Sequence, residues 1–125
     1  MHGHSYRMRV SVSGTLDEHG MVVDYFDLRR IIDPVIDRID HAFLCDRSDA
    51  PMLAFLQEND LKHVVVSFPS TAENIACWLL EQVVAQLNGY GNITEISVRL
   101  HETERTYAEA RQRMTPEDER SKPEE

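Results

Sequence analysis

The chain has 125 residues and a formal net charge of −9, with 42% hydrophobic and 28% charged residues. These values are typical of one soluble globular domain, and the negative charge argues against a nucleic-acid partner, because such proteins neutralise phosphates with basic residues. No run approaches the ~20 apolar residues of a membrane span, and the two cysteines predict no disulfide framework, which favours a cytoplasmic location.

The first predicted element is a strand that begins at Tyr6, because apolar residues occupy alternate positions as far as Val12. Extended backward, the same period places His2 and His4 on one side of the strand, roughly 7 Å apart at about 3.3 Å rise per residue. Two imidazoles at this separation can bind one metal ion, and Gly3 between them leaves room for close approach. Alternatively, they are two exposed histidines at a frayed or tagged N-terminus.

A turn, a short strand and a helix are predicted next. Residues 14–20 read as a turn and residues 21–23 as a second strand, which together make a hairpin. Asp24 or Asp27 can cap the helix that follows, and Pro34 is expected to kink this helix or to limit its first half. The apolar residues of this helix lie alternately three positions and one position apart, which is the spacing of one helical face: Leu28, Ile31, Ile32, Val35, Ile36 and Ile39.

Asp40 and His41 follow this helix directly, at the start of a predicted polar turn over residues 40–50. One interpretation is a polar turn in which the partial negative charge at the C-terminal end of the helix favours a histidine at position 41. The functional interpretation is a general acid/base histidine held by a carboxylate. A short helix over residues 52–56 and a strand within residues 63–68 are predicted to follow.

The last predicted elements are a long helix and a final strand. Ser70 and Glu73 predict a capping box for the helix, whose apolar stripe runs to Leu87, and residues 93–100 alternate as a strand. The element order indicates an α+β fold in which two helices pack on one face of an antiparallel sheet. The domain is expected to cover residues 1–112, and residues 113–125 are expected to be an acidic disordered tail.

Three further side chains are of a type that can carry chemistry. Glu102 lies just past the last predicted strand; it is either a solvated strand-end carboxylate or, if buried, one that accepts two hydrogen bonds from an amidine-like edge of a pterin or guanine. Cys77 is expected to be a packing residue of the long helix. Cys45 is expected in a loop and to be unreactive, because only Arg47 is positive nearby.

Taken together, the sequence resembles the 6-pyruvoyl-tetrahydropterin synthase / 6-carboxytetrahydropterin synthase family over residues 2–110. Five segments match that family's motifs in order and spacing: residues 2–6, 20–28, 39–44, 70–76 and 98–103. The resemblance implies a tunnelling-type α+β fold that assembles as trimers stacked into a hexamer. It also implies a Zn²⁺ ion held by His2, His4 and a third histidine.

The implied activity is that of a zinc-dependent lyase converting 7,8-dihydroneopterin triphosphate to 6-carboxy-5,6,7,8-tetrahydropterin, a precursor of queuosine and deazapurines. Asp40 and His41 match the catalytic pair of the family. The resemblance makes Glu102 the anchor of the pterin ring, with Thr71 and Glu73 also in the substrate site. Zinc would hold the side-chain hydroxyls of the substrate and acidify the adjacent C–H.

The chain also departs from the family pattern. The third zinc histidine and a catalytic cysteine would fall before Met1, so we expect an N-terminally incomplete copy that lacks the first strand. His19, His63 or His101 could replace the missing ligand. Two alternative functions stay open: 6-pyruvoyl-tetrahydropterin synthase, which shares all the visible motifs, and a non-catalytic pterin-binding or assembly subunit.

Overall fold

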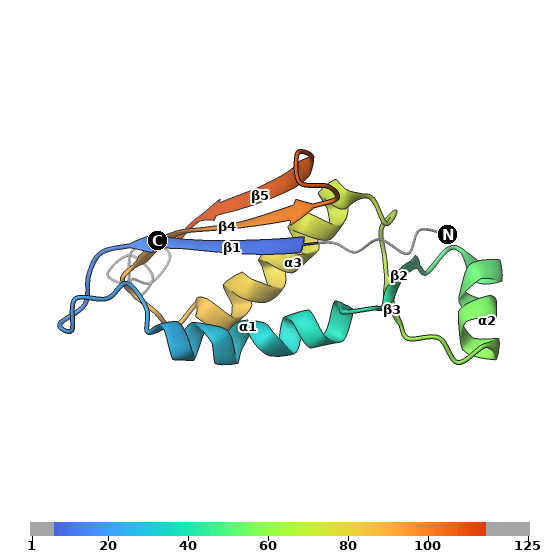
Figure 1. Ribbon diagram of the computed structural model, residues 1–125, viewed down its shortest axis with the longest axis horizontal. Helices are drawn as coiled ribbons and strands as arrows, with labels where there is room; N and C mark the ends of the chain where they lie inside the picture. The colour runs from blue at the N-terminus through green and yellow to red at the C-terminus, as the bar shows by residue number, and fades with distance from the viewer. Residues whose placement is uncertain (1–6, 115–125) are drawn as a thin grey trace, which may run out of the picture.

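The computed structural model of the protein describes residues 7–114. An antiparallel sheet has the strand order β1 (Arg7–Gly14), β4 (Ile93–His101) and β5 (Tyr107–Arg113), and β2 (Phe43–Asp46) pairs in parallel with β3 (His63–Val66) as a separate two-stranded sheet. Both long helices, α1 and α3, lie on one face of the three-stranded sheet (Figure 1). The elements are β1 (Arg7–Gly14), α1 (Tyr25–Ile39), β2 (Phe43–Asp46), α2 (Ala50–Glu58), β3 (His63–Val66), α3 (Ala72–Leu87), β4 (Ile93–His101) and β5 (Tyr107–Arg113).

This arrangement confirms the predicted α+β class, with an antiparallel sheet covered by two helices on one side. Alternation in β1 is as predicted, since Met8, Val10 and Val12 are half-buried against the core and the residues between them are exposed. Within residues 7–114, no helix is long and apolar enough to cross a membrane.

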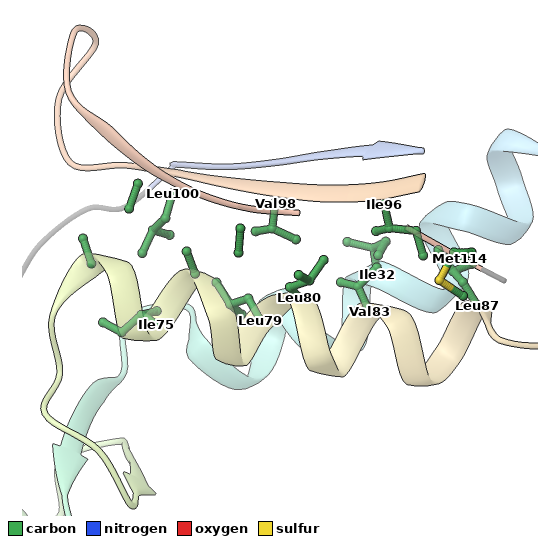
Figure 2. Packing of buried hydrophobic residues seen from close by; sticks show 14 of the residues in the cluster. Ile32, Ile75, Leu79, Leu80, Val83, Leu87, Ile96, Val98, Leu100 and Met114 are labelled. Carbon is green, nitrogen blue, oxygen red and sulfur yellow. The ribbon is translucent and has the colours of Figure 1, made fainter. Parts of the chain in front are cut away.

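The core lies between this sheet and the buried stripe of α3 (Figure 2). Leu79, Val83 and Leu87 of that stripe have no exposed surface, and neither do Ile96 and Val98 of β4. Burying side chains of this size stabilises the fold by about 1.5–3 kcal/mol each. The contact fixes the N-terminus of α3 beside the end of β4.

Helix α1 begins where the carboxylate of Asp24 accepts hydrogen bonds from the N–H groups of Phe26, at 2.8 Å, and Asp27, at 3.4 Å. Asp24 is therefore the N-cap, one of the two predicted alternatives. Pro34 lies inside the helix, which continues through it to Ile39. The prediction that the proline limits the first half is wrong.

The predicted strand over residues 21–23 is also wrong, because the described structure has no strand there. Hydrogen bonds to side chains occupy this backbone instead. The carboxylate of Asp17 accepts from the Met21 N–H at 3.0 Å, which lowers the pKa of Asp17. The side-chain amide of Asn92 donates to the Val22 carbonyl at 2.6 Å, so side chains satisfy groups that a hairpin ladder would pair.

Two strands were missed. β2 lies within the predicted polar turn and is only four residues long. β5 follows the strand predicted to be the last, and its inward positions hold the small residues Ala108 and Ala110, which give weak alternation in hydrophobicity. Met114 packs in the same core, whereas residues 115–125 of the predicted tail lie outside the described residues.

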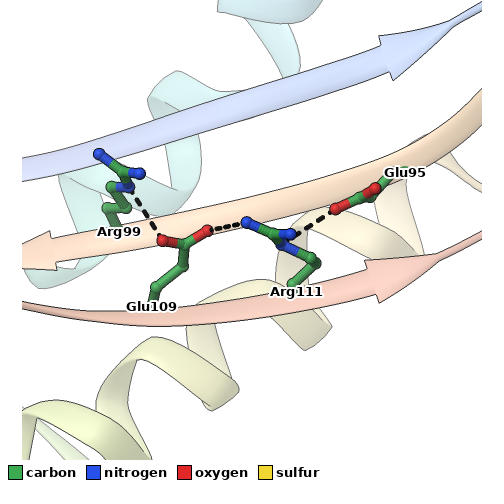
Figure 3. Close-up of polar contacts among 4 residues, drawn as sticks. All are labelled: Glu95, Arg99, Glu109 and Arg111. Carbon is green, nitrogen blue, oxygen red and sulfur yellow. Dashed lines mark hydrogen bonds and ion pairs between the residues drawn. The ribbon is translucent and has the colours of Figure 1, made fainter.

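The outer face of the sheet carries a chain of ion pairs across β4 and β5 (Figure 3). Glu109 accepts from Arg111 at 2.7 Å and from Arg99 at 3.0 Å, and Arg111 also pairs with Glu95 at 3.0 Å. The hydrogen bond from Arg111, reinforced by that from Arg99, lowers the pKa of Glu109. These charges satisfy one another on the face opposite the helices.

Candidate functional site

A cavity of about 590 Å³ is formed where β2 and α2 meet the start of α3 and the end of β4. This volume lies in the range of small-molecule sites. Thr71 and Glu73 from the start of α3 and Glu102 from beyond β4 all line the cavity. The structure therefore brings together three predicted site residues that are separated by up to 31 positions in the sequence.

The start of α3 differs from the predicted capping box. Its N-cap is Thr71, whose side-chain oxygen accepts a hydrogen bond from the Asn74 N–H at 3.2 Å, so the prediction of Ser70 as the cap is wrong. Glu73 then falls one position too early to close a capping box. Within residues 7–114, its carboxylate has no hydrogen-bond or ion-pair partner. Capping therefore does not account for Glu73, which is free to bind a ligand in the cavity.

Glu102 occupies the tight connection between β4 and β5. Its N–H donates to the Thr106 carbonyl at 3.1 Å, which fixes the backbone, while its side chain has no partner among the described residues. The side chain is exposed, contrary to the buried carboxylate considered from the sequence. Glu73 and Glu102 thus present two unpaired carboxylates to one cavity.

Sequence reasoning did not find two further carboxylates in the lining, Asp46 and Asp49. Both carboxylates already accept hydrogen bonds from backbone N–H groups. Asp46 accepts from the Ser48 N–H at 3.0 Å, and Asp49 caps α2 by accepting from the Met52 N–H at 3.2 Å. An aspartate just before Ala50-Pro51 is a recognisable helix-start signal that could have identified Asp49.

The charge of the cavity is strongly negative. Four carboxylates line it, and no lysine or arginine of the described residues does. Hydrogen-bond donors of a ligand are therefore favoured inside, and phosphate groups are disfavoured, because like charges repel at short range.

Cys45 lies in β2, not in the predicted loop, and the residue is 4% exposed in the wall of the cavity. Burial raises the pKa of this thiol, and the carboxylates of Asp49 and Asp46 raise it further. A neutral thiol is a poor nucleophile, which agrees with the prediction that Cys45 is unreactive. Cys77 is exposed on α3, so its prediction as a packing residue is wrong.

Asp40 and His41 lie beside the cavity and outside its lining. Asp40 ends α1, with its N–H donating to the Ile36 carbonyl at 2.8 Å, and Ala42, the residue after His41, lines the cavity. The His41 Nε2 lies 3.7 Å from the Asp40 Oδ1, and the two side chains are 91% and 60% exposed. Within the described chain the pair faces solvent, and its catalytic role stays a prediction.

The predicted zinc ligands His2 and His4 lie outside the described residues. The three histidines considered as replacements are dispersed: His19 is 3.5 Å from Glu18, the Nδ1 of His63 is 2.7 Å from a backbone carbonyl, and the ring of His101 packs on Tyr107. Residues 7–114 contain no group of three histidine, cysteine, aspartate or glutamate side chains that could hold a metal ion.

Comparison with known proteins places these features in context. A family model described as 6-pyruvoyl tetrahydropterin synthase matches residues 1–113. The chain is 34% identical to the 6-carboxy-5,6,7,8-tetrahydropterin synthase of Haemophilus influenzae, over 87% of this chain and 80% of that one. It is also 34% identical to the enzyme of the same name from Aquifex aeolicus, over 78% of this chain and 64% of that one.

Solved structures show the same fold. The crystal structure of 6-pyruvoyl tetrahydropterin synthase from Plasmodium vivax superposes with a TM-score of 0.73, covering 90% of this chain and 82% of that one, at 17% sequence identity. The Plasmodium falciparum protein of that name gives a TM-score of 0.71 at 18% identity. At this level of identity the likeness concerns the arrangement of helices and strands.

Proposed function

Because the chain belongs to the 6-pyruvoyl tetrahydropterin synthase family of enzymes, we propose that it is a zinc-dependent lyase converting 7,8-dihydroneopterin triphosphate to 6-carboxy-5,6,7,8-tetrahydropterin. The choice of the carboxy product follows the names of the relatives from Haemophilus influenzae and Aquifex aeolicus. The product would serve as a precursor of queuosine and deazapurines.

The observation that carries this proposal is the pair of unpaired carboxylates, Glu73 and Glu102, on one cavity with the hydroxyl of Thr71. A pterin ring presents an exocyclic amino group and a neighbouring ring N–H as parallel donors. A carboxylate can accept both hydrogen bonds at once, in the fork geometry that makes charge-assisted pairs strong and specific. The Thr71 hydroxyl already accepts from the helix, and its own hydrogen remains available to a ring carbonyl or nitrogen.

The orientation of the substrate follows from the charge of the cavity. None of the described lining residues is basic, so we expect the ring to enter the cavity and the triphosphate to stay outside this lining. The reacting side chain of the substrate would then lie between the two parts. Ala42 lines the cavity and His41 precedes it, which would put an imidazole near that side chain.

His41 would act as the general acid/base and Asp40 as the carboxylate that orients it. The pair is too exposed in a single chain to exclude water from a reaction, since 91% of the His41 side chain is accessible. We therefore expect a homo-oligomer, a trimer or hexamer, in which a second copy covers the pair.

His2 and His4 would hold the zinc ion, which when bound polarises substrate oxygens and makes the adjacent C–H more acidic. A catalytic zinc site needs three protein ligands, and residues 7–114 contain no such group by themselves. His101 is unsuitable as the third ligand: it pairs with Arg7 and lies on the outer face of the sheet, whereas continued alternation would place His2 and His4 on the side of Met8. His19, His63 or a group outside the described residues would then supply the third ligand.

Zinc content tests this part separately from turnover. Metal analysis of the purified protein should give about one zinc per chain, and the His2→Ala and His4→Ala variants should lose most of it. Unchanged zinc in both variants would contradict the assignment. A cytoplasmic location is part of the same proposal, and the two free thiols, Cys45 and Cys77, suit a reducing compartment.

Turnover is tested by incubating the zinc-loaded protein with 7,8-dihydroneopterin triphosphate and analysing the products. Release of acetaldehyde together with 6-carboxy-5,6,7,8-tetrahydropterin supports the proposal. Loss of triphosphate with formation of 6-pyruvoyl-tetrahydropterin would assign the sibling activity, and binding without turnover would assign a non-catalytic pterin-binding subunit. Asp40→Asn is the matched variant, expected to bind the substrate and to turn it over more slowly.

A further inference from the structure

Lys62 makes an unusual set of contacts at the end of α1. Lys62 and Lys122 are the only lysines in the chain. The Nζ of Lys62 donates to the Asp37 carbonyl at 2.5 Å and to the Asp40 carbonyl at 2.8 Å, across 25 and 22 positions in the sequence. The last carbonyls of a helix lack partners within it and carry partial negative charge, so an ammonium group there makes charge-assisted hydrogen bonds.

The backbone of Lys62 holds the other side of the same turn. Its carbonyl accepts from the Phe43 N–H at 3.0 Å, where β2 begins. Between these two contacts, the Ala42 N–H donates to the Ile39 carbonyl at 3.0 Å. One residue therefore fixes the chain both before and after His41.

His41 needs this support because its backbone has φ 54°, in the left-handed region. A residue other than glycine is uncommon there and stays in place only when the surrounding structure holds it. The His41 side chain is 91% exposed, so packing of the imidazole does not hold it. Within residues 7–114, Lys62 is the only residue whose side chain donates to the Asp40 carbonyl.

We propose that Lys62 is a positioning residue for the Asp40–His41 pair: its ammonium group fastens the end of α1 and thereby holds the turn that carries His41 beside Ala42, at the edge of the cavity. This inference rests on the proposed function, since it assigns Lys62 to the same reaction. Lys62 itself lies outside the cavity lining. Its loss should therefore affect the catalytic step more than substrate binding.

Steady-state kinetics of four proteins tests the proposal: wild type, Lys62→Met, Lys62→Arg and Lys122→Met. Lys62→Met should lower kcat about tenfold, because a small displacement of a catalytic group is costly, while KM changes less than about twofold. Lys62→Arg keeps the charge and the donors and should recover most of kcat. Lys122→Met, which removes the other lysine, should match wild type. An unchanged kcat in a folded Lys62→Met protein would overturn the proposal, as would a rise in KM alone.

Amide hydrogen exchange gives a second readout that does not need turnover. The Ala42 amide, whose hydrogen bond closes the turn, should exchange faster in Lys62→Met than in wild type and recover in Lys62→Arg. If wild type shows no turnover, the proposed function fails, and this measurement still decides whether Lys62 holds the turn. Equal exchange of Ala42 in all variants would overturn the inference even where the enzyme is active.

Discussion

Replacing Glu102 by glutamine removes the charge of the carboxylate and keeps its shape. A hydrogen bond to a charged group contributes about 1.5–3 kcal/mol and a neutral one about 0.5–1.5 kcal/mol. Glutamine also replaces one acceptor oxygen by an amino group that would face the donors of the pterin. Because Glu102 is exposed in the free chain, solvent screening should limit the loss of binding free energy to about 1–2 kcal/mol. This corresponds to a pterin dissociation constant about 5- to 30-fold higher.

Isothermal titration of neopterin into wild type, Glu102→Gln and Glu104→Gln measures this loss. Glu104 lies two residues along the same connection, is exposed, and does not line the cavity, so its variant should bind as wild type does. Stability should change by less than about 0.5 kcal/mol in both variants, since the Glu102 side chain has no partner among the described residues. Unaltered affinity of Glu102→Gln, or an equal loss in both variants, would refute the assignment.

Three stability predictions follow from the packing and charges, each measured by urea denaturation. Gly14→Ala should cost about 3 kcal/mol, because its Cβ would lie 2.2 Å from the Asn92 carbonyl oxygen; a loss under about 1 kcal/mol would contradict that close approach. Leu79→Ala should also cost about 3 kcal/mol, because the side chain has no exposed surface; a near-neutral effect would mean that the core is packed differently. The hydrogen bond from Arg111 lowers the pKa of Glu109 from its usual 4.5, so the stabilisation is complete above about pH 5 and is lost as the pH falls through the lowered pKa. The difference in stability between wild type and Glu109→Gln should therefore shrink below about pH 4, and a constant difference would contradict the ion pair.

Elements with a long apolar stripe could be predicted from the sequence, and elements with small or few apolar residues could not. The stripe of α3 is buried over its whole length, so its periodicity was a reliable signal. β5 turns only Ala108 and Ala110 inward, and the alternation was too weak to distinguish it from a polar tail. Residues 21–23 are a short apolar run after a turn, which resembles a strand, but the side chains of Asp17 and Asn92 bind its backbone in place of a partner strand.

The prediction of the site residues depended more on the resemblance to a known family than on local sequence patterns. Glu73 read as a capping residue, because the pattern could not distinguish Ser70 from Thr71 as the cap. Nothing in the spacing of Glu73 and Glu102 indicates that they share a cavity, which arises only when α3 packs on β4. The contact between Lys62 and the end of α1 is likewise tertiary, and no periodic signal accompanies it.

The most direct test of the pterin site is a crystal structure of the protein with bound neopterin. We expect the amino group and ring N–H of the pterin to lie within hydrogen-bond distance of the Glu102 or Glu73 carboxylate, with the ring in the cavity between α2 and the start of α3. A pterin bound elsewhere, or bound in this cavity with its donor edge turned to solvent, would contradict it.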